Sequence, residues 1–433
     1  MMKDDLKRKI NLPTAIFIII GYVVGATIFI LPGELSAIVG PGVFLAYLLA
    51  GVPALFYCFV IAQVGSAFPT SGGGYVLIKG ALSPFLGFIY LWVVLSLAVL
   101  AVPLIAMGFA RYLSLALTGL DVQWIAFASI AVFVLTNCLG MAVAGAAQNI
   151  MVVLFLLALL LFSGTGIIYG DSTLLEPLLP FGYQGVFLAA ATAYFSYAGI
   201  LVVAEIAGEI KNPGRNIPLA IAISFIVVIL TYTLVPLSLS QMMPWQDLGK
   251  TQTPVVAAAQ QYLSPFLVNI IWIGALFAAA TSINGIMMGL SRDLYKGAVE
   301  GLFPRVLAKI HPSRGTPVAA ILVIGTLAIL GVMSGNNIVQ YAQVAVVGLM
   351  ITQILTSLAV LRMPKVLPEQ YAQSRFKLSP LFLIFFSLAS AVISLVFLGV
   401  LVVQTPAMGG VALLYLGVGS IYYFRPTKVQ RSV

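Results

Sequence analysis

Two polar interruptions within hydrophobic segments are the parts of the chain best suited to chemistry. The first lies in Gly21–Phe29, where Gly25, Ala26 and Thr27 stand near the middle of an apolar run. The second is Tyr194–Gly199, again central in its segment. Unwound backbone at mid-membrane is tolerated only where it is buried in protein or lines a cavity. Because paired interruptions in two halves of a chain are a sequence signal for a transport site, these stretches are candidates for one.

The ends of a broken helix can hold opposite charges. Its N-terminal half exposes free N–H groups at a positive dipole end, which suit a carboxylate, and exposed carbonyls suit an ammonium group or a metal cation. No Lys, Arg, Asp or Glu lies within either interruption. A neutral zwitterion fits such a site. The alternative is that Gly21 and Gly25 form a contact between small residues on packed helices.

Glu205 is a carboxylate that falls within predicted span six, four residues before Glu209 at the end of that span. It is a candidate proton carrier, because burial favours the neutral form of a carboxyl group. The alternative is a helix-end residue that reaches the cytoplasmic interface or pairs with a loop arginine.

Enzymatic chemistry has little support in the sequence. Cys58 and Cys138 fall inside predicted spans, and His311 lies in a basic loop. They form no metal-ligand spacing and no pair of nucleophile and base. Gly72–Gly74 lacks the Lys-Ser/Thr of a phosphate-binding loop. We therefore expect no catalytic residues, no metal beyond a coupling ion, no cofactor and no nucleic-acid partner.

The elements that must position these residues are membrane-spanning helices. Of the 433 residues, 61% are hydrophobic and 8% are charged, whereas soluble domains carry about 25% charged residues. The apolar runs do not alternate, so helices of about 20 residues are expected rather than barrel strands. We predict twelve spans, at 13–37, 41–67, 84–112, 124–144, 148–169, 183–209, 218–240, 264–290, 317–334, 339–361, 379–403 and 409–424.

The distribution of positive charge predicts the orientation. With both termini in the cytoplasm, 19 of the 21 Lys and Arg residues fall in cytoplasmic segments, and only Arg111 and Lys250 fall outside. Short cytoplasmic loops carry such an excess. We expect a multi-pass protein of the plasma (inner) membrane, with its net charge of +9 explained by topology.

Four motifs resemble those of the amino acid–polyamine–organocation (APC) permeases. They are Gly21–Phe29 followed by Leu31-Pro32-Gly33, Pro69–Tyr75, Phe195–Gly199 followed by Glu209–Pro218, and Ser291–Tyr295 with Gly301–Pro304. They occur in the family's order along residues 12–320. The resemblance implies an all-α membrane protein of the leucine-transporter type, with alternating access around a central site.

In such a fold, two inverted repeats of five helices each form a single transporter domain with broken helices 1 and 6. Here the repeats would comprise residues 12–170 and 183–362, with peripheral helices at 379–424. The resemblance implies that the substrate contacts Gly25, Ala26, Thr27, Ile28, Phe195, Ser196, Tyr197, Ala198 and Gly199. Phe195 would be an aromatic lid, although packing against lipid or the core is its alternative.

Departures from the family narrow the expected substrate. Antiporters of arginine and polyamines tend to carry an acidic residue just after the glycine of span six, where this chain has Ile200 and Leu201. An unpaired cation in a low-dielectric site is costly, so we expect a neutral amino acid. A polyamine or cationic amino acid antiporter is the runner-up. Some proton-coupled relatives place a lysine after a Gln-Asn pair in span five, and none follows Gln148-Asn149 here.

The coupling ion stays open between Na⁺ and H⁺. Sodium-coupled members of the wider fold use carbonyls of span one and hydroxyls of span eight. The matching candidate sodium ligands are Gly21, Val24, Ala278, Thr281 and Ser282. The alternative is that Thr281 and Ser282 only bond their own helix.

Expected partners are the amino acid, membrane lipids and, as an open alternative, a second copy in a homodimer. Animal relatives pair with a heavy subunit through a cysteine after span three, and 113–123 contains none. We therefore expect no disulfide-linked heavy subunit. A non-transporting amino acid sensor on the same fold is the alternative of another class. Such a sensor would be expected to carry an added regulatory tail.

Overall fold

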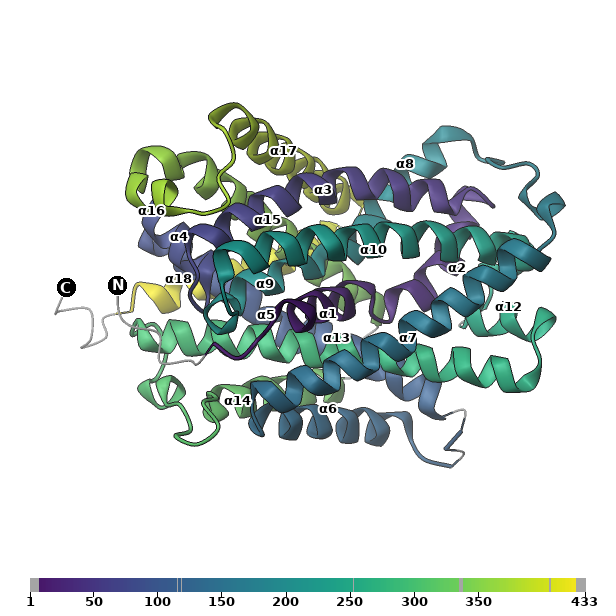
Figure 1. Ribbon diagram of the computed structural model, residues 1–433, viewed down its shortest axis with the longest axis horizontal. Helices are drawn as coiled ribbons and strands as arrows, with labels where there is room; N and C mark the ends of the chain where they lie inside the picture. The colour runs from purple at the N-terminus through teal and green to yellow at the C-terminus, as the bar shows by residue number, and fades with distance from the viewer. Residues whose placement is uncertain are drawn as a thin grey trace.

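The computed structural model describes residues 8–425, apart from 115, 118, 252, 335–337 and 405. The helices form an elongated bundle in which most run roughly along the long axis (Figure 1). In the described part of the chain there is no β-strand, and one isolated bridge joins Ile10 to Ile210. The prediction of an all-α protein is confirmed.

The α-helices are α1 (Leu12–Val24), α2 (Thr27–Val39), α3 (Val43–Ala67), α4 (Gly73–Ala81), α5 (Pro84–Ser114), α6 (Val122–Cys138), α7 (Met141–Tyr169), α8 (Gly182–Ala193), α9 (Val202–Glu205), α10 (Pro213–Met242), α11 (Trp245–Leu248), α12 (Pro254–Tyr262), α13 (Pro265–Val299), α14 (Val318–Met333), α15 (Ile338–Val366), α16 (Pro368–Gln373), α17 (Pro380–Gln404) and α18 (Pro406–Tyr423). The 3-10 helices are η1 (Ser172–Leu175), η2 (Tyr194–Leu201), η3 (Ala207–Glu209) and η4 (Arg305–Ala308).

Nine helical stretches among the described residues are long and apolar enough to cross a membrane. They are Leu12–Val39, Val43–Ala67, Pro84–Ser114, Met141–Tyr169, Gly182–Glu205, Pro213–Met242, Pro265–Val299, Val344–Val366 and Pro380–Val403. Three shorter apolar helices, Val122–Cys138, Val318–Met333 and Gly409–Tyr423, coincide with the remaining predicted segments. The protein is therefore a multi-pass membrane protein.

Local sequence signals explain where several helices begin. Asn11 caps α1, since its side chain accepts a hydrogen bond from Thr14 N–H at 2.9 Å, a favourable arrangement at a helix start. Proline occupies the first turn of α1, α10, α12 and α13, where its missing N–H costs nothing. The predicted boundary between the fourth and fifth spans is wrong: the fourth was expected to reach residue 144 and the fifth to begin at 148, but α6 ends at Cys138 and α7 begins at Met141.

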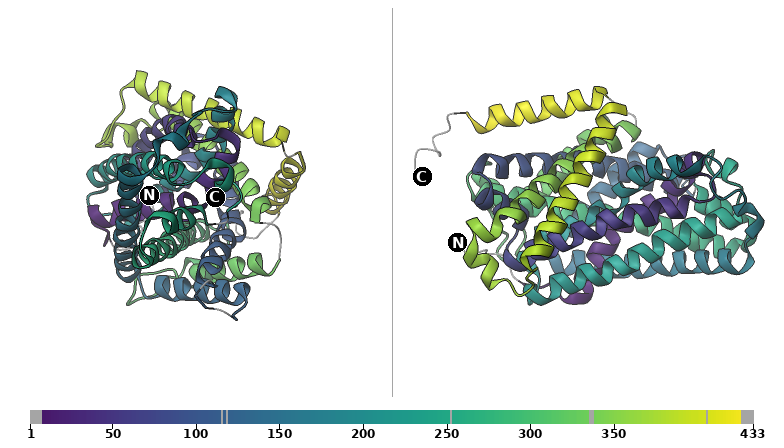
Figure 2. Two further views of the ribbon diagram at one scale, coloured as in Figure 1. Left: turned by 90° about the vertical axis from the view of Figure 1, so that its right-hand side faces the viewer. Right: turned by 90° about the horizontal axis from the view of Figure 1, so that it is seen from above.

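The first span lies inside the bundle and the last two helices lie outside it. α1 packs against α7, α10, α13 and η2. α17 and α18 sit on the periphery (Figure 2), where α18 contacts only α5, α15 and α17 among the principal helix pairs of the described chain. The start of α1 and the end of α18 lie at the same end of the molecule (Figure 1).

Candidate functional site

The first span is broken at Gly25. α1 ends at Val24, Gly25 has φ 40° and ψ −152°, and α2 begins at Thr27. A side chain at Gly25 would be strained by its positive φ, and a Cβ there would collide with Ser282 Oγ. The break therefore depends on a glycine for two independent reasons. No side chain caps the N-terminus of α2, so its first N–H groups face the break without such a partner.

Hydroxyls of α13 cover the carbonyl end of α1. Thr281 Oγ1 lies 3.1 Å from Gly21 O and 2.7 Å from Ala278 O. Ser282 Oγ lies 3.2 Å from Gly21 O and 3.4 Å from Tyr22 O. Four of the five candidate sodium ligands thus gather in one place. The fifth, the carbonyl of Val24, accepts a bond from Thr27 Oγ1 at 3.1 Å.

Tyr232 of α10 joins the two interruptions. Its hydroxyl lies 2.7 Å from Val23 O of span one and 3.0 Å from Ser196 O of span six. It also lies 3.4 Å from Thr27 Oγ1. Tyr232 is fully buried. One side chain therefore fixes the backbone of both predicted segments relative to each other.

Span six is tightened rather than unwound. Tyr194–Leu201 forms the 3-10 helix η2 between α8 and α9, so the expected gap is not present. This change of helix type occurs at the predicted position. Gly199 allows a close approach to span one, since a Cβ there would lie 2.9 Å from Val23 N. The two segments are in contact through their backbones.

Buried hydroxyls line the space between the segments. Ser196 Oγ and Tyr47 OH face one another closely enough to interact, and neither has a further hydrogen-bond partner among the described residues. Tyr197 OH donates to Tyr47 O at 3.0 Å, and the Tyr197 and Tyr232 rings meet edge to face at 5.0 Å. These hydroxyls place polar groups where the two segments meet.

A network of polar side chains from α6, α7 and α13 is hydrogen-bonded to the backbone of Thr281. Gln148 Nε2 donates to Thr281 O at 3.2 Å. Asn284 Nδ2 donates to Gln148 Oε1 at 2.8 Å, and Asn137 Nδ2 donates to Asn284 Oδ1 at 2.8 Å. The network ties α6 and α7 to α13, so the position of Thr281 is set by three helices.

The chain is also similar in sequence to known proteins. A family model described as amino acid permease matches residues 10–419. The chain belongs to the amino acid permease family. The permease is a transporter by family, not an enzyme.

Three relatives illustrate the similarity. The branched-chain amino acid permease BcaP of Bacillus subtilis (strain 168) is 28% identical over 388 residues, covering 85% of this chain and 83% of that protein. The methylthioribose transporter of the same organism is 28% identical over 380 residues, covering 83% and 82%. Cationic amino acid transporter 5 of Arabidopsis thaliana is 28% identical over 359 residues, covering 78% of the permease and 62% of that protein.

Two of the remaining predicted residues of the permease differ in burial. Ile28 is buried, and Phe195 is partly buried against the core. The side chain of Ala198 lies outside the described part. The sequence reasoning missed Tyr232, which holds the two segments together. Its signal was a tyrosine between Thr231 and Thr233 in the middle of an apolar helix.

Glu205 does not reach the surface. It is 4% exposed, and its carboxyl faces that of Asp293 on α13. Glu209 is the residue that takes an arginine, with Arg292 Nε 2.7 Å from its Oε1 and both side chains at most 2% exposed. The alternative in which Glu205 pairs with a loop arginine is therefore not what the structure shows.

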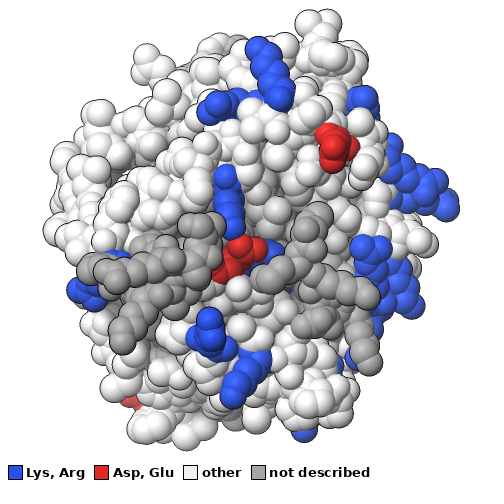
Figure 3. Space-filling view, turned by 90° about the vertical axis from the view of Figure 1, so that its left-hand side faces the viewer, with Lys and Arg blue, Asp and Glu red and all other residues white. Residues whose placement is uncertain are grey.

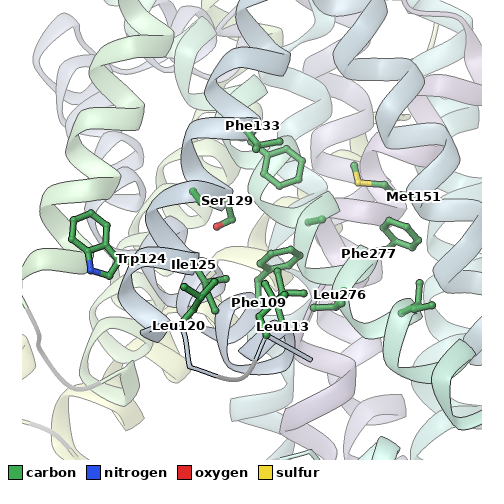
Figure 4. Close-up of a pocket in the computed structure, with 15 residues that line it drawn as sticks. Phe109, Leu113, Leu120, Trp124, Ile125, Ser129, Phe133, Met151, Leu276 and Phe277 are labelled. Atoms are coloured by element: carbon green, nitrogen blue, oxygen red, sulfur yellow. The ribbon is translucent and has the colours of Figure 1, made fainter. Parts of the chain in front are cut away.

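A cavity of about 450 Å³ opens between α5, α6, α7 and α13. Figure 4 shows its lining, which includes Phe109, Trp124, Phe133 and Phe277. Apart from the hydroxyl of Ser129 and the indole N–H of Trp124, the lining side chains are apolar. The cavity contains none of the predicted site residues, and its chemistry does not suit a zwitterion.

Proposed function

We propose that the permease is a secondary-active transporter that moves a neutral amino acid across the plasma membrane by alternating access, as symport or exchange. The observation that carries this proposal is the break at Gly25 held against η2 by Tyr232. The break offers N–H groups and hydroxyls to a zwitterion without a charged side chain. Gly25, Ala26, Thr27 and Ile28 would bind it from span one, and Phe195–Gly199 from span six, with Phe195 as a lid.

A neutral, apolar substrate is favoured over a cationic one. Ile200 and Leu201 follow Gly199 and are buried, at 3% and 4% exposed. Because both side chains are apolar, neither offers a counter-charge to an ammonium group. The relative named as a branched-chain amino acid permease supports this preference. The relative named as a cationic amino acid transporter keeps the antiporter of cationic amino acids or polyamines as the second candidate.

The test is a screen of the purified protein against the twenty amino acids, with and without Na⁺. Thermal shift reports binding, and counterflow in proteoliposomes reports transport. We expect aliphatic neutral amino acids to be exchanged, and arginine and putrescine to be inert. Exchange of arginine in preference to leucine would support the antiporter instead. Binding without any transport would support the sensor.

The proposed topology has twelve spans in two inverted repeats of five, with both termini in the cytoplasm. In its support, the first helix of each half changes conformation at its middle. Lys and Arg side chains gather on the face at the end where the chain starts (Figure 3), as expected for a cytoplasmic face. With Cys58 and Cys138 replaced, Ser313→Cys should resist an impermeant maleimide in intact cells, and Lys250→Cys should react.

A further inference from the structure

Two buried carboxyl groups oppose each other at one end of span six. Glu205, the last residue of α9, is 4% exposed, and Asp293 of α13 is fully buried. Their carboxyls lie within hydrogen-bonding range. No N–H or O–H group of a described residue donates to either oxygen of Asp293. A buried carboxyl with no donor needs a proton or a cation.

The surrounding backbone is shaped to admit the pair. A Cβ at Gly289, one turn before Asp293 on α13, would collide with Glu205 Oε2. A Cβ at Gly72 would lie 3.4 Å from Asp293 Oδ1, and Gly72 N–H donates to Glu205 O at 3.0 Å. Glycines therefore give both carboxyls their space.

Three tyrosines belong to the electrostatic surroundings of the pair. Tyr22 of α1, Tyr57 of α3 and Tyr90 of α5 each lie close enough to interact with Glu205. Tyr90 OH is buried and has no hydrogen-bond partner in the described chain. This buried hydroxyl, within electrostatic reach of both carboxyls, adds a polar group to the surroundings of the pair.

The nearby cations are already engaged. Arg292 pairs with Glu209 and also donates to Ser291 Oγ at 2.8 Å. Lys296, whose stem lies beside Gly72, directs its ammonium group to Glu300 at 3.1 Å, and Lys79 reaches the same carboxylate at 2.6 Å. None of these contacts neutralises Glu205 or Asp293.

Two carboxylates in close contact cannot both ionise cheaply in a low-dielectric interior, so such pairs hold one proton between them. We propose that Glu205 and Asp293 form a shared proton-binding site that couples proton movement to transport. The proposal rests on the proposed transport function. The proton adds to one carboxylate oxygen, and the resulting O–H donates to the other carboxylate. Release returns the proton to water and leaves both groups charged.

Tyr22 connects this pair to the break in span one. It lies three residues before Gly25, its carbonyl is 3.4 Å from Ser282 Oγ, and its side chain lies within electrostatic reach of both carboxyls. A Cβ at Gly285 would touch the Tyr22 side chain at 3.1 Å, so α13 and α1 are closely packed here. A rearrangement of span one on substrate binding therefore moves a group that borders the proton site.

Infrared spectroscopy tests the shared proton without requiring transport. The lipid-embedded wild type should show the C=O band of a protonated buried carboxyl at neutral pH. Asp293→Asn and Glu205→Gln should each remove it, and the exposed control Asp247→Asn should keep it. The wild-type spectrum tests the proposal even if a variant fails to fold. Absence of the protonated-carboxyl band from the wild type would overturn the proposal. Loss of the band on adding Na⁺ at constant pH would assign the pair to a metal cation and would also overturn it.

Proteoliposomes test the coupling. A pH gradient should drive accumulation of the exchanged amino acid in the wild type and in Asp247→Asn. Asp293→Asn and Glu205→Gln should lose this accumulation tenfold or more and flatten the pH profile of whatever exchange they retain. Full gradient-driven accumulation in both variants would refute the coupling role. If the wild type moves no amino acid, the proposed function fails, while the infrared result still decides whether the proton site exists.

Discussion

Replacing Tyr232 with phenylalanine tests how the break in span one and the 3-10 segment of span six are held together. The change removes one oxygen and leaves the buried ring in place. That oxygen lies 2.7 Å from Val23 O and 3.0 Å from Ser196 O. Because a phenol donates one proton at a time, the mutation deprives at least one of these buried carbonyls of its donor.

The expected loss of free energy in Tyr232→Phe follows from this geometry. A neutral hydrogen bond contributes about 0.5–1.5 kcal/mol net, and a buried acceptor left without a donor costs about 1–3 kcal/mol. The larger figure applies because Tyr232 is fully buried. Since the hydroxyl fixes both segments of the proposed substrate site, up to all of that energy should be lost from substrate binding. A loss of about 1–3 kcal/mol corresponds to about a 5- to 150-fold rise in the KM of counterflow.

Tyr415→Phe is the matched control. Tyr415 OH donates to Trp92 O at 2.7 Å, which joins peripheral α18 to α5. Both variants should lower the Tm of the purified protein by a few degrees, and only Tyr232→Phe should raise KM. Wild-type counterflow kinetics in Tyr232→Phe would refute the reasoning, as would an equal rise of KM in the control.

Three further predictions address the break, the coupling ion and a peripheral ion pair. Gly25→Ala should abolish uptake and lower Tm, because a positive φ costs about 1–2 kcal/mol and the added methyl meets Ser282 Oγ; Gly164→Ala, with open space around it, should be neutral. Thr281→Ala with Ser282→Ala should abolish Na⁺-dependent uptake, and wild-type transport unchanged with choline in place of Na⁺ would contradict sodium coupling. Burial raises the pKa of Glu300, but hydrogen bonds and charge from two lysines outweigh it and hold the pKa below its ordinary value. Its stabilisation is therefore present above the unfolded pKa of about 4.3 and lost as pH falls through the lowered value, so Tm in Glu300→Gln should fall less steeply in acid than in the wild type.

The break in span one could be predicted because it needs a particular residue type. A glycine within an apolar run, followed by a hydroxyl residue, is a costly choice for a membrane helix unless the backbone requires it. The structure gives Gly25 a positive φ and a neighbour that leaves no room for a Cβ. The break could thus be predicted from the local sequence, because Gly25 itself is the residue that the conformation requires.

The conformation of span six could not be predicted in the same way. Tightening from an α-helix to a 3-10 helix changes the bonding pattern from i−4 to i−3 and needs no residue with positive φ. The residues Tyr194–Leu201 are compatible with either state. The sequence therefore predicted the position of the irregular segment in span six but not its 3-10 conformation.

Contacts between distant spans were beyond sequence reasoning. Tyr232 reads as one more aromatic residue in an apolar helix, and Asp293 reads as part of a basic loop motif. Their roles depend on which helices are neighbours: α10 lies against α1, and α13 lies against α9. A single sequence contains no measure of that proximity.

The geometry of α13 separates the two candidate coupling ions. Thr281 and Ser282 cover the carbonyls of α1 at one level of this helix, and Asp293 lies about 18 Å further along it at 1.5 Å per residue. The candidate sodium ligands include no carboxylate, whereas the proposed proton pair consists of two. Substitutions at one level leave the other level's ligands in place, so loss of Na⁺ dependence and loss of proton coupling are independent outcomes. The two sites share a helix but no atom. Loss of transport coupling after substitution at only one of the two sites would therefore identify the ion that this site binds as the coupling ion.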